Sequence, residues 1–137
     1  MMRRWVLIAA MLICVVFVHA LVSNVVAKRE ERKREAVFQE TLRSYQEALK
    51  PGMTRKQVED YLNSKDASFT RTCCIDQEGR FAADITKIWQ GKPPWYCNDN
   101  SMYVAFQFTT PALAATSSDP KDVLDKVMLY QHLGGCL

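Results

Sequence analysis

The sequence predicts an α+β protein, with an N-terminal transmembrane helix followed by two helices packed on a three- to four-stranded antiparallel sheet. Three observations predict this fold class. An apolar run near the N-terminus extends from Trp5 to Val22. Apolar residues between Phe38 and Leu62 repeat at helical spacing. After Asp66 the pattern changes to two-residue alternation, which is typical of half-buried strands.

Composition divides the chain into four expected segments. These are a short tail (1–4), an anchor (5–27), a juxtamembrane helix (28–50) and a small α+β domain (51–137). About 110 residues lie outside the anchor, which is enough for a single modest core. The net charge of +3 is mild, so we expect no nucleic-acid partner.

The apolar run has the length of a membrane span. A helix needs roughly 20 apolar residues to cross the hydrocarbon core, and Trp5 at one end suits the interface. We therefore expect contact with the lipid bilayer through Trp5–Ala27. A cleaved signal peptide is the alternative, with Arg3 and Arg4 as its basic start, and it would leave a secreted, inhibitor-like domain. The run exceeds the roughly 7–15 residues of a signal-peptide core, which favours an uncleaved anchor.

Two signals disagree about which side of the membrane holds the domain. The basic residues of Lys28–Arg34 outnumber Arg3 and Arg4 and favour a cytoplasmic domain. This stretch is either a solvated helix face or a site for anionic lipid head groups. The even number of cysteines outside the membrane favours an oxidising compartment. We expect a single-pass protein of the bacterial inner membrane with a periplasmic domain, stapled through Cys73, Cys74, Cys97 and Cys136.

The pairing of these cysteines remains open at this point. Adjacent residues of a strand point to opposite faces, so we expect Cys73 and Cys74 to pair separately with Cys97 and Cys136. Structural zinc is an alternative, with His132 or Cys136 as the fourth ligand, although adjacent cysteines lack the usual spacing. A reactive thiol with His132 as its base is another. Both alternatives would place the domain in the cytoplasm.

Two helices are expected between the membrane and the sheet. The first has an apolar stripe from Phe38 to Leu49 and ends at Pro51-Gly52. The second begins with a capping box formed by Thr54 and Gln57. We expect it to end at Asn63, a residue that tolerates the left-handed conformation. A hydrophobic staple between Met53 and Val58 supports the same start.

The segment PGMTRKQVEDYLNSKD, from Pro51 to Asp66, resembles the helix signature of SmpA/OmlA (BamE-like) small envelope domains. The resemblance implies two helices followed by an antiparallel three-stranded sheet. It also implies an envelope location, and the family's named member is an accessory of outer-membrane β-barrel assembly. Asn63 and Lys65 replace the usual Gly and Pro, and the family's lipidated cysteine is missing here. The matching positions are Gly52, Met53, Thr54, Val58, Leu62, Ser64 and Asp66.

The second half of the chain reads as strands separated by turns. Expected strands cover 67–75, Asp84–Trp89, Met102–Thr109 and Val123–Leu133, and the register of the second is not predictable because Ile85 and Ile88 are out of phase. We expect a turn at Asn98–Ser101 and a loop at Pro111–Asp122.

No catalytic motif is present. The chain has no phosphate-binding loop, no dinucleotide fingerprint and no nucleophile elbow. We therefore expect neither an enzyme nor a bound cofactor or metal. The function expected is a membrane-anchored interaction or envelope-maintenance module with an envelope protein as partner. Its candidate partner surface consists of Trp95, Tyr96, Tyr103 and Arg71.

Overall fold

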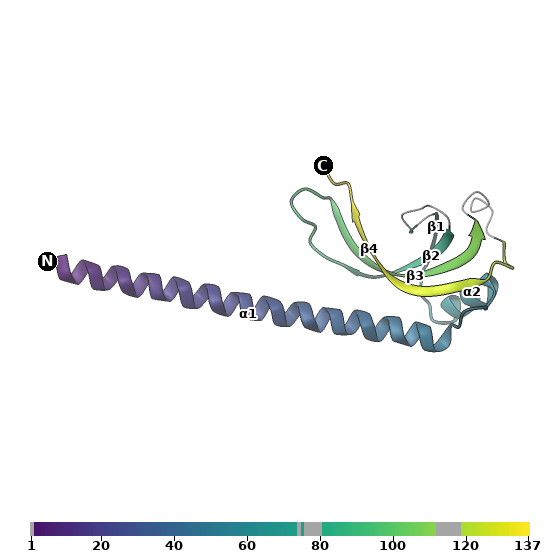
Figure 1. Ribbon diagram of the computed structural model, residues 1–137, viewed down its shortest axis with the longest axis horizontal. Coiled ribbons are helices and arrows are strands. Elements are labelled where there is room, and N and C mark those ends of the chain that lie inside the picture. The colour runs from purple at the N-terminus through teal and green to yellow at the C-terminus, as the bar shows by residue number, and fades with distance from the viewer. Residues whose placement is uncertain (1, 74, 76–80, 112–118) are drawn as a thin grey trace. The chain divides into compact units, whose positions relative to one another are not determined.

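The computed structural model describes residues 2–73, 75, 81–111 and 119–137 and has the predicted α+β class (Figure 1). The chain forms two compact units, Met1–Val37 and Phe38–Leu137. The elements are α1 (Met2–Ala48), α2 (Arg55–Ser64), β1 (Thr70–Cys73), β2 (Phe81–Gln90), β3 (Asp99–Pro111) and β4 (Leu124–Gly134).

The first helix combines two of the expected segments. The predicted anchor and juxtamembrane helix form one continuous element, α1, and α2 is the one separate helix that follows it among the described residues. The physical reason is composition, because no Gly or Pro lies between Met2 and Lys50 to interrupt the helix. Pro51 and Gly52 follow it as predicted, and Gly52 has a positive φ of 94°.

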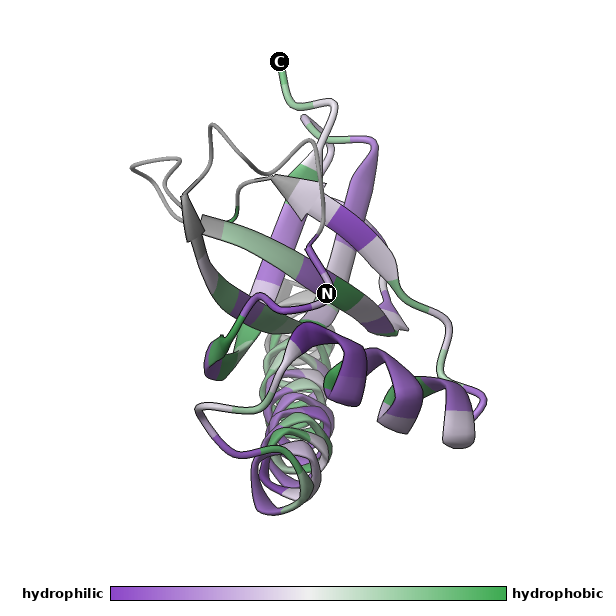
Figure 2. Ribbon diagram, turned by 90° about the vertical axis from the view of Figure 1, so that its right-hand side faces the viewer, coloured by the Kyte–Doolittle hydropathy of each residue, from purple (hydrophilic) through white to green (hydrophobic). Residues whose placement is uncertain are grey.

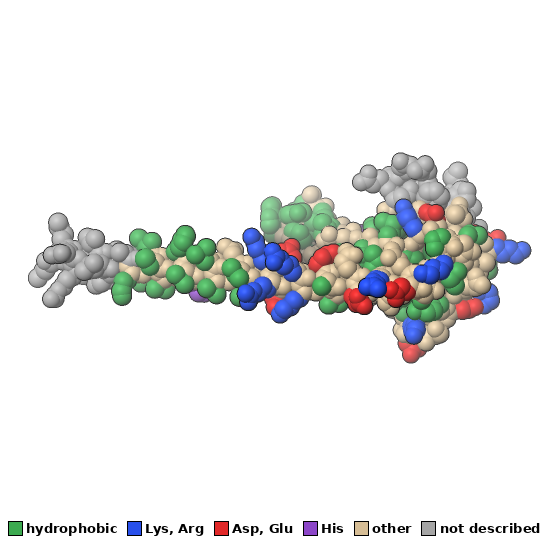
Figure 3. All heavy atoms as spheres, turned by 60° about the horizontal axis from the view of Figure 1, so that its bottom comes forward, with side chains coloured by type: hydrophobic (Ala, Val, Ile, Leu, Met, Phe, Trp, Pro, Cys, Tyr) green, Lys and Arg blue, Asp and Glu red, His purple; other side chains and the backbone are tan. Residues whose placement is uncertain are grey.

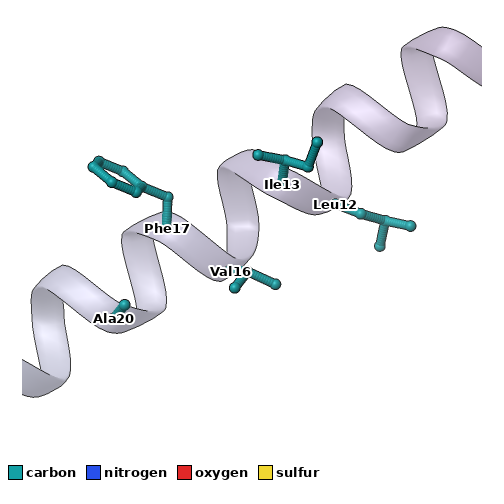
Figure 4. Close-up of a pocket in the computed structure, with 5 residues that line it drawn as sticks. All are labelled: Leu12, Ile13, Val16, Phe17 and Ala20. Atoms are coloured by element: carbon teal, nitrogen blue, oxygen red, sulfur yellow. The ribbon is translucent and has the colours of Figure 1, made fainter.

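In the N-terminal unit, α1 is long and apolar enough to cross a membrane, and none of its most apolar stretch is buried. Hydrophobic side chains cover the visible face of this segment, and lysines and arginines gather where it ends (Figure 3). The five apolar side chains Leu12, Ile13, Val16, Phe17 and Ala20 project from a single helix around a shallow hollow (Figure 4). Such a surface has the chemistry of a lipid-facing helix.

The sheet of the C-terminal unit is an antiparallel meander. Its strand order is β1-β2-β3-β4, and each pair of neighbours is antiparallel. A register shift between Lys87 and Trp89 explains why the apolar residues of β2 are out of phase in the sequence. The turn predicted at Asn98–Ser101 is wrong, because Asp99 already pairs with Gly134 in the β3–β4 ladder. The chain turns earlier, between Gln90 and Asp99.

One face of the sheet carries the core. Val104, Phe106 and Phe108 are fully buried against apolar residues of the two helices. The predicted stripe of α1 is confirmed, since the Tyr45 ring lies 5.3 Å from that of Phe106 and Leu49 belongs to the same core. The C-terminal part of α1 and α2 both lie on this side of the sheet (Figure 2).

The start of α2 has the predicted capping box. The Thr54 side chain accepts from the Gln57 backbone N–H, and the Gln57 side chain accepts from the Thr54 N–H. The predicted end at Asn63 is wrong by one residue, since α2 continues to Ser64. The left-handed conformation falls instead on Asp66, with a φ of 52°.

The free N–H groups of the first turn of α2 are satisfied by the segment that leads into β4. The Arg55 N–H donates to the Asp122 carbonyl at 2.7 Å, and the Lys56 N–H donates to the Pro120 carbonyl at 3.1 Å. The Leu124 N–H donates to the Met53 carbonyl at 2.8 Å. These bonds fix α2 to the beginning of β4 and replace the partners that every helix start lacks.

Candidate interaction surface

A disulfide joins Cys97 to Cys136 across 39 residues of sequence. The expectation that these two cysteines pair with Cys73 and Cys74 is therefore wrong. The sheet register explains the observed pairing, because Asp99 lies opposite Gly134 and each cysteine lies two residues beyond that pair. Cys74 and the side chain of Cys73 lie outside the described residues. The thiol of Cys14 on α1 is free and exposed.

The disulfide is part of a larger closure between the β2–β3 loop and the C-terminus. Backbone bonds lie on both sides of it: Asn98 N–H donates to the Gly134 carbonyl and Leu137 N–H donates to the Tyr96 carbonyl, both at 2.9 Å. Within the loop, Cys97 N–H donates to the Pro94 carbonyl at 3.0 Å. These contacts join the loop to the C-terminus although much of the loop is exposed.

The loop presents two aromatic side chains to solvent. Trp95 is 91% exposed and Tyr96 is 42% exposed. Their rings are in edge-to-face contact, with centroids 5.6 Å apart. Tryptophan is highly buried on average in folded proteins, whereas tryptophan and tyrosine are enriched at protein interfaces. The paired rings on a fixed loop therefore form a candidate contact site.

Tyr103, the third predicted surface residue, lies in the middle of the sheet. It is a direct cross-strand neighbour of Lys87 and Tyr130. The Lys87 ammonium lies 5.7 Å from the centre of the Tyr103 ring, and the Tyr130 ring is 6.2 Å away. The Tyr130 hydroxyl lies 3.4 Å from Nδ1 of His132. This polar and aromatic row occupies the face of the sheet opposite the helices.

Arg71, the fourth predicted residue, lies on the other face. It is in register with Asp84 and Phe106, whose side chains face the helices. Its guanidinium binds Glu59 of α2 at 2.9 Å and is half exposed. The structure thus brings Trp95 and Tyr96 together, and it places Tyr103 and Arg71 on opposite faces of the sheet.

A buried ion network that the sequence did not indicate centres on Arg55. Its side chain is only 2% exposed, and Asp84, which receives two of its N–H groups, is fully buried. A third N–H reaches Asp122 at 3.4 Å, and the guanidinium lies 4.7 Å from the Phe108 ring centre. In the sequence, Arg55 stands directly after the helix cap, a position at which an exposed residue is expected. That position therefore gave no indication of a buried ion pair.

The charges of this network compensate one another. Burial lowers the pKa of Arg55, but its hydrogen bonds to Asp84 and Asp122 outweigh this and raise the pKa above the ordinary value. Burial raises the pKa of Asp84, and the Arg55 guanidinium opposes that shift. Because Arg55 is held charged and is paired with two carboxylates, Asp84 and Asp122, the network has the character of a structural support.

Within the described part of the chain, no three His, Cys, Asp or Glu side chains form a group that could hold a metal ion. No protein-family model, curated protein or solved structure matches the chain. The candidate site therefore depends on the geometry of the chain itself.

Proposed function

We propose that this protein is a membrane-anchored, non-catalytic interaction or envelope-maintenance module whose C-terminal unit lies outside the cytoplasm. The observation that carries the proposal is the almost fully exposed Trp95 on a loop that the Cys97–Cys136 disulfide holds in place. A large apolar side chain fixed in solvent offers contact area at a small entropic cost.

The apolar half of α1 supports the anchor. Its side chains are exposed along a helix that is long enough to cross a bilayer. We place the anchor at Trp5–Ala27 in a bacterial inner membrane, with Arg3 and Arg4 on the cytoplasmic side. The likeness of Pro51–Asp66 to BamE-like domains favours the same envelope setting.

The disulfide supports an oxidising compartment over the cytoplasm. Disulfides persist in the periplasm and outside the cell, and they are rare where thiols are kept reduced. In the disulfide, neither Cys97 nor Cys136 is a thiolate, so neither can bind zinc or act as a nucleophile. This geometry disfavours the zinc and thiol-redox alternatives that need those residues.

The partner contact can be tested by photo-cross-linking in the native host. A benzoylphenylalanine at Trp95 of the full chain is expected to form an adduct with another envelope protein. The same probe at Lys56, an exposed position on α2, is the matched control and is expected to form none. An adduct pattern that is the same for both positions, or no adduct at Trp95, would contradict the proposal.

A further inference from the structure

We propose that the outer edge of β4 accepts an extended segment of the partner protein as a fifth strand. The inference rests on the proposed function, because it names the way in which the interaction module binds its partner. β4 is the last strand of the order β1-β2-β3-β4, so among the residues that the structure describes no strand lies along its outer side. An exposed edge of this kind is a ready template for strand addition.

Two hydrogen bonds show which backbone groups of β4 point outward. The Gly134 carbonyl accepts from Asn98, so it faces β3. The Val127 carbonyl accepts at 2.9 Å from the Gln46 side chain of α1, so it faces away from β3. Directions alternate along an antiparallel strand. The outward-pointing groups beyond Val127 therefore belong to Leu129, Gln131 and Leu133.

These three residues form the open part of the edge. Near its start, the outer side of β4 is already occupied, because the Leu124 carbonyl accepts from Gly52 and the Leu124 N–H donates to Met53. Gln46 covers the edge at Val127. From Leu129 to Leu133, no backbone N–H or C=O that points outward has a hydrogen-bond partner among the residues that the structure describes.

The open edge has none of the features that protect sheet edges. Proteins block such edges with short strands, charged side chains or proline. The opposite edge has two of these features, since β1 has four residues and carries Arg71. β4 has eleven residues, and the segment from Val127 to Leu133 contains no Lys, Arg, Asp, Glu or Pro. Leu133 on this segment is 43% exposed.

The side chains along the edge define the chemistry of the incoming segment. Leu129 and Leu133 lie on one face with Gln131 between them, so the partner residues opposite the two leucines should be apolar. Because the β4 segment has no charged side chain, a charged partner segment would gain no ion pair from it. We infer an extended, uncharged segment with apolar side chains at alternate positions.

A second copy of this chain fits the edge less well. In the folded unit, Phe38 contacts Trp89 near one end of the sheet, and Gln46 reaches Val127 farther along, so this part of α1 runs antiparallel to β4. Pairing two β4 strands about a two-fold axis would make the Phe38–Ala48 parts of the two α1 helices run in opposite directions. The chains that lead from Phe38 to the two proposed anchors at Trp5–Ala27 would then leave the dimer in opposite directions, which is unfavourable for two anchors in one bilayer.

The test is cross-linking in the native host from Leu133 of the full chain, with benzoylphenylalanine at that position. Gln131→Pro removes one outward N–H without touching the β3 ladder. Gln131→Ala is the matched control, since it removes the side chain and keeps the N–H. The adduct with a different protein is expected to persist in Gln131→Ala and to fall at least tenfold in Gln131→Pro.

Three results would overturn the inference: equal adducts in both variants, equal loss in both, or an adduct only with a second copy of the chain. No adduct from Leu133, with the Trp95 adduct intact, would also overturn it while leaving the proposed function standing. If neither the Leu133 probe nor the Trp95 probe forms an adduct in a chain that keeps Gln131, the proposed function is contradicted as well. Folding of Gln131→Pro is checked by formation of the Cys97–Cys136 disulfide.

Discussion

At the residue scale, the most consequential contact is the buried pair of Arg55 and Asp84. Arg55 follows directly after the Thr54 cap, so its side chain leaves the first turn of α2 toward the sheet. There it meets Asp84 of β2, which is fully buried. Removing one partner of a buried pair leaves the other charge without compensation, whereas removing both together is far less harmful.

Asp84→Ala is therefore expected to lower the free energy of unfolding by about 3–5 kcal/mol, since it leaves Arg55 buried and partly unpaired. The full chain in detergent micelles can be unfolded with urea and followed by tryptophan fluorescence. Arg71→Ala is the control, because its pair with Glu59 is half exposed and such pairs contribute about 0–1 kcal/mol. Equal losses for the two variants would contradict the structural role of the buried network.

At the element scale, the capping box fixes the start of α2, and the disulfide fixes the loop that carries Trp95. The capping box begins α2, and the disulfide joins the β2–β3 loop to the end of β4. Each can be removed by a single substitution that leaves the core intact.

Thr54→Ala is expected to destabilise the folded unit by about 1 kcal/mol, because the first turn of α2 loses its side-chain acceptor. The same urea titration measures the effect. Thr109→Ala serves as the control, since the Thr109 hydroxyl donates a hydrogen bond of 3.3 Å to the Val123 carbonyl at an exposed position but caps no helix. A larger effect for Thr109→Ala would show that the cap is unimportant.

Cys136→Ala is expected to cost about 2–4 kcal/mol of stability, because it frees the C-terminus from the β2–β3 loop. The quenching of Trp95 fluorescence by soluble quenchers should also change, because the loop that carries Trp95 loses one of its supports. Cys14→Ala, which removes a free thiol on α1, is the control and should leave the unfolding curve unchanged.

Local sequence patterns predicted the elements better than they predicted the contacts between them. Features that depend on residues close in sequence could be predicted. They are the helix cap, the apolar stripe from Phe38 to Leu49 and the central residues of the strands. The disulfide pairing depends on the register of β3 against β4, which alternation alone does not specify. The Arg55–Asp84 pair joins a helix start to a strand 29 residues away, and no local pattern signals such a contact.

At the scale of the whole molecule, the chain combines an apolar helix with a folded unit whose exposed features cluster in its C-terminal half. Trp95 and the disulfide belong to the closure between the β2–β3 loop and the C-terminus, and the open edge of β4 ends at Leu133, directly before it in sequence. A membrane anchor would confine this surface near a bilayer and raise its effective concentration toward partners in the same membrane.

The side of the membrane on which the folded unit lies decides whether the proposed function can hold, and cysteine accessibility measures it. Lys121→Cys places a thiol at an exposed position before β4, and Met2→Cys places one at the first residue of α1. Both are made in a chain in which Cys14, Cys73 and Cys74 are replaced by alanine. Spheroplasts are treated with a membrane-impermeant maleimide before and after lysis.

We expect Lys121→Cys to react in intact spheroplasts and Met2→Cys to react only after lysis. Cys97 and Cys136 are expected to react only after denaturation and reduction. The reverse pattern, with Cys97 and Cys136 reactive without reductant, would contradict the extracytoplasmic assignment. It would place the folded unit in the cytoplasm and favour the alternatives in which the thiols bind zinc or carry out redox chemistry.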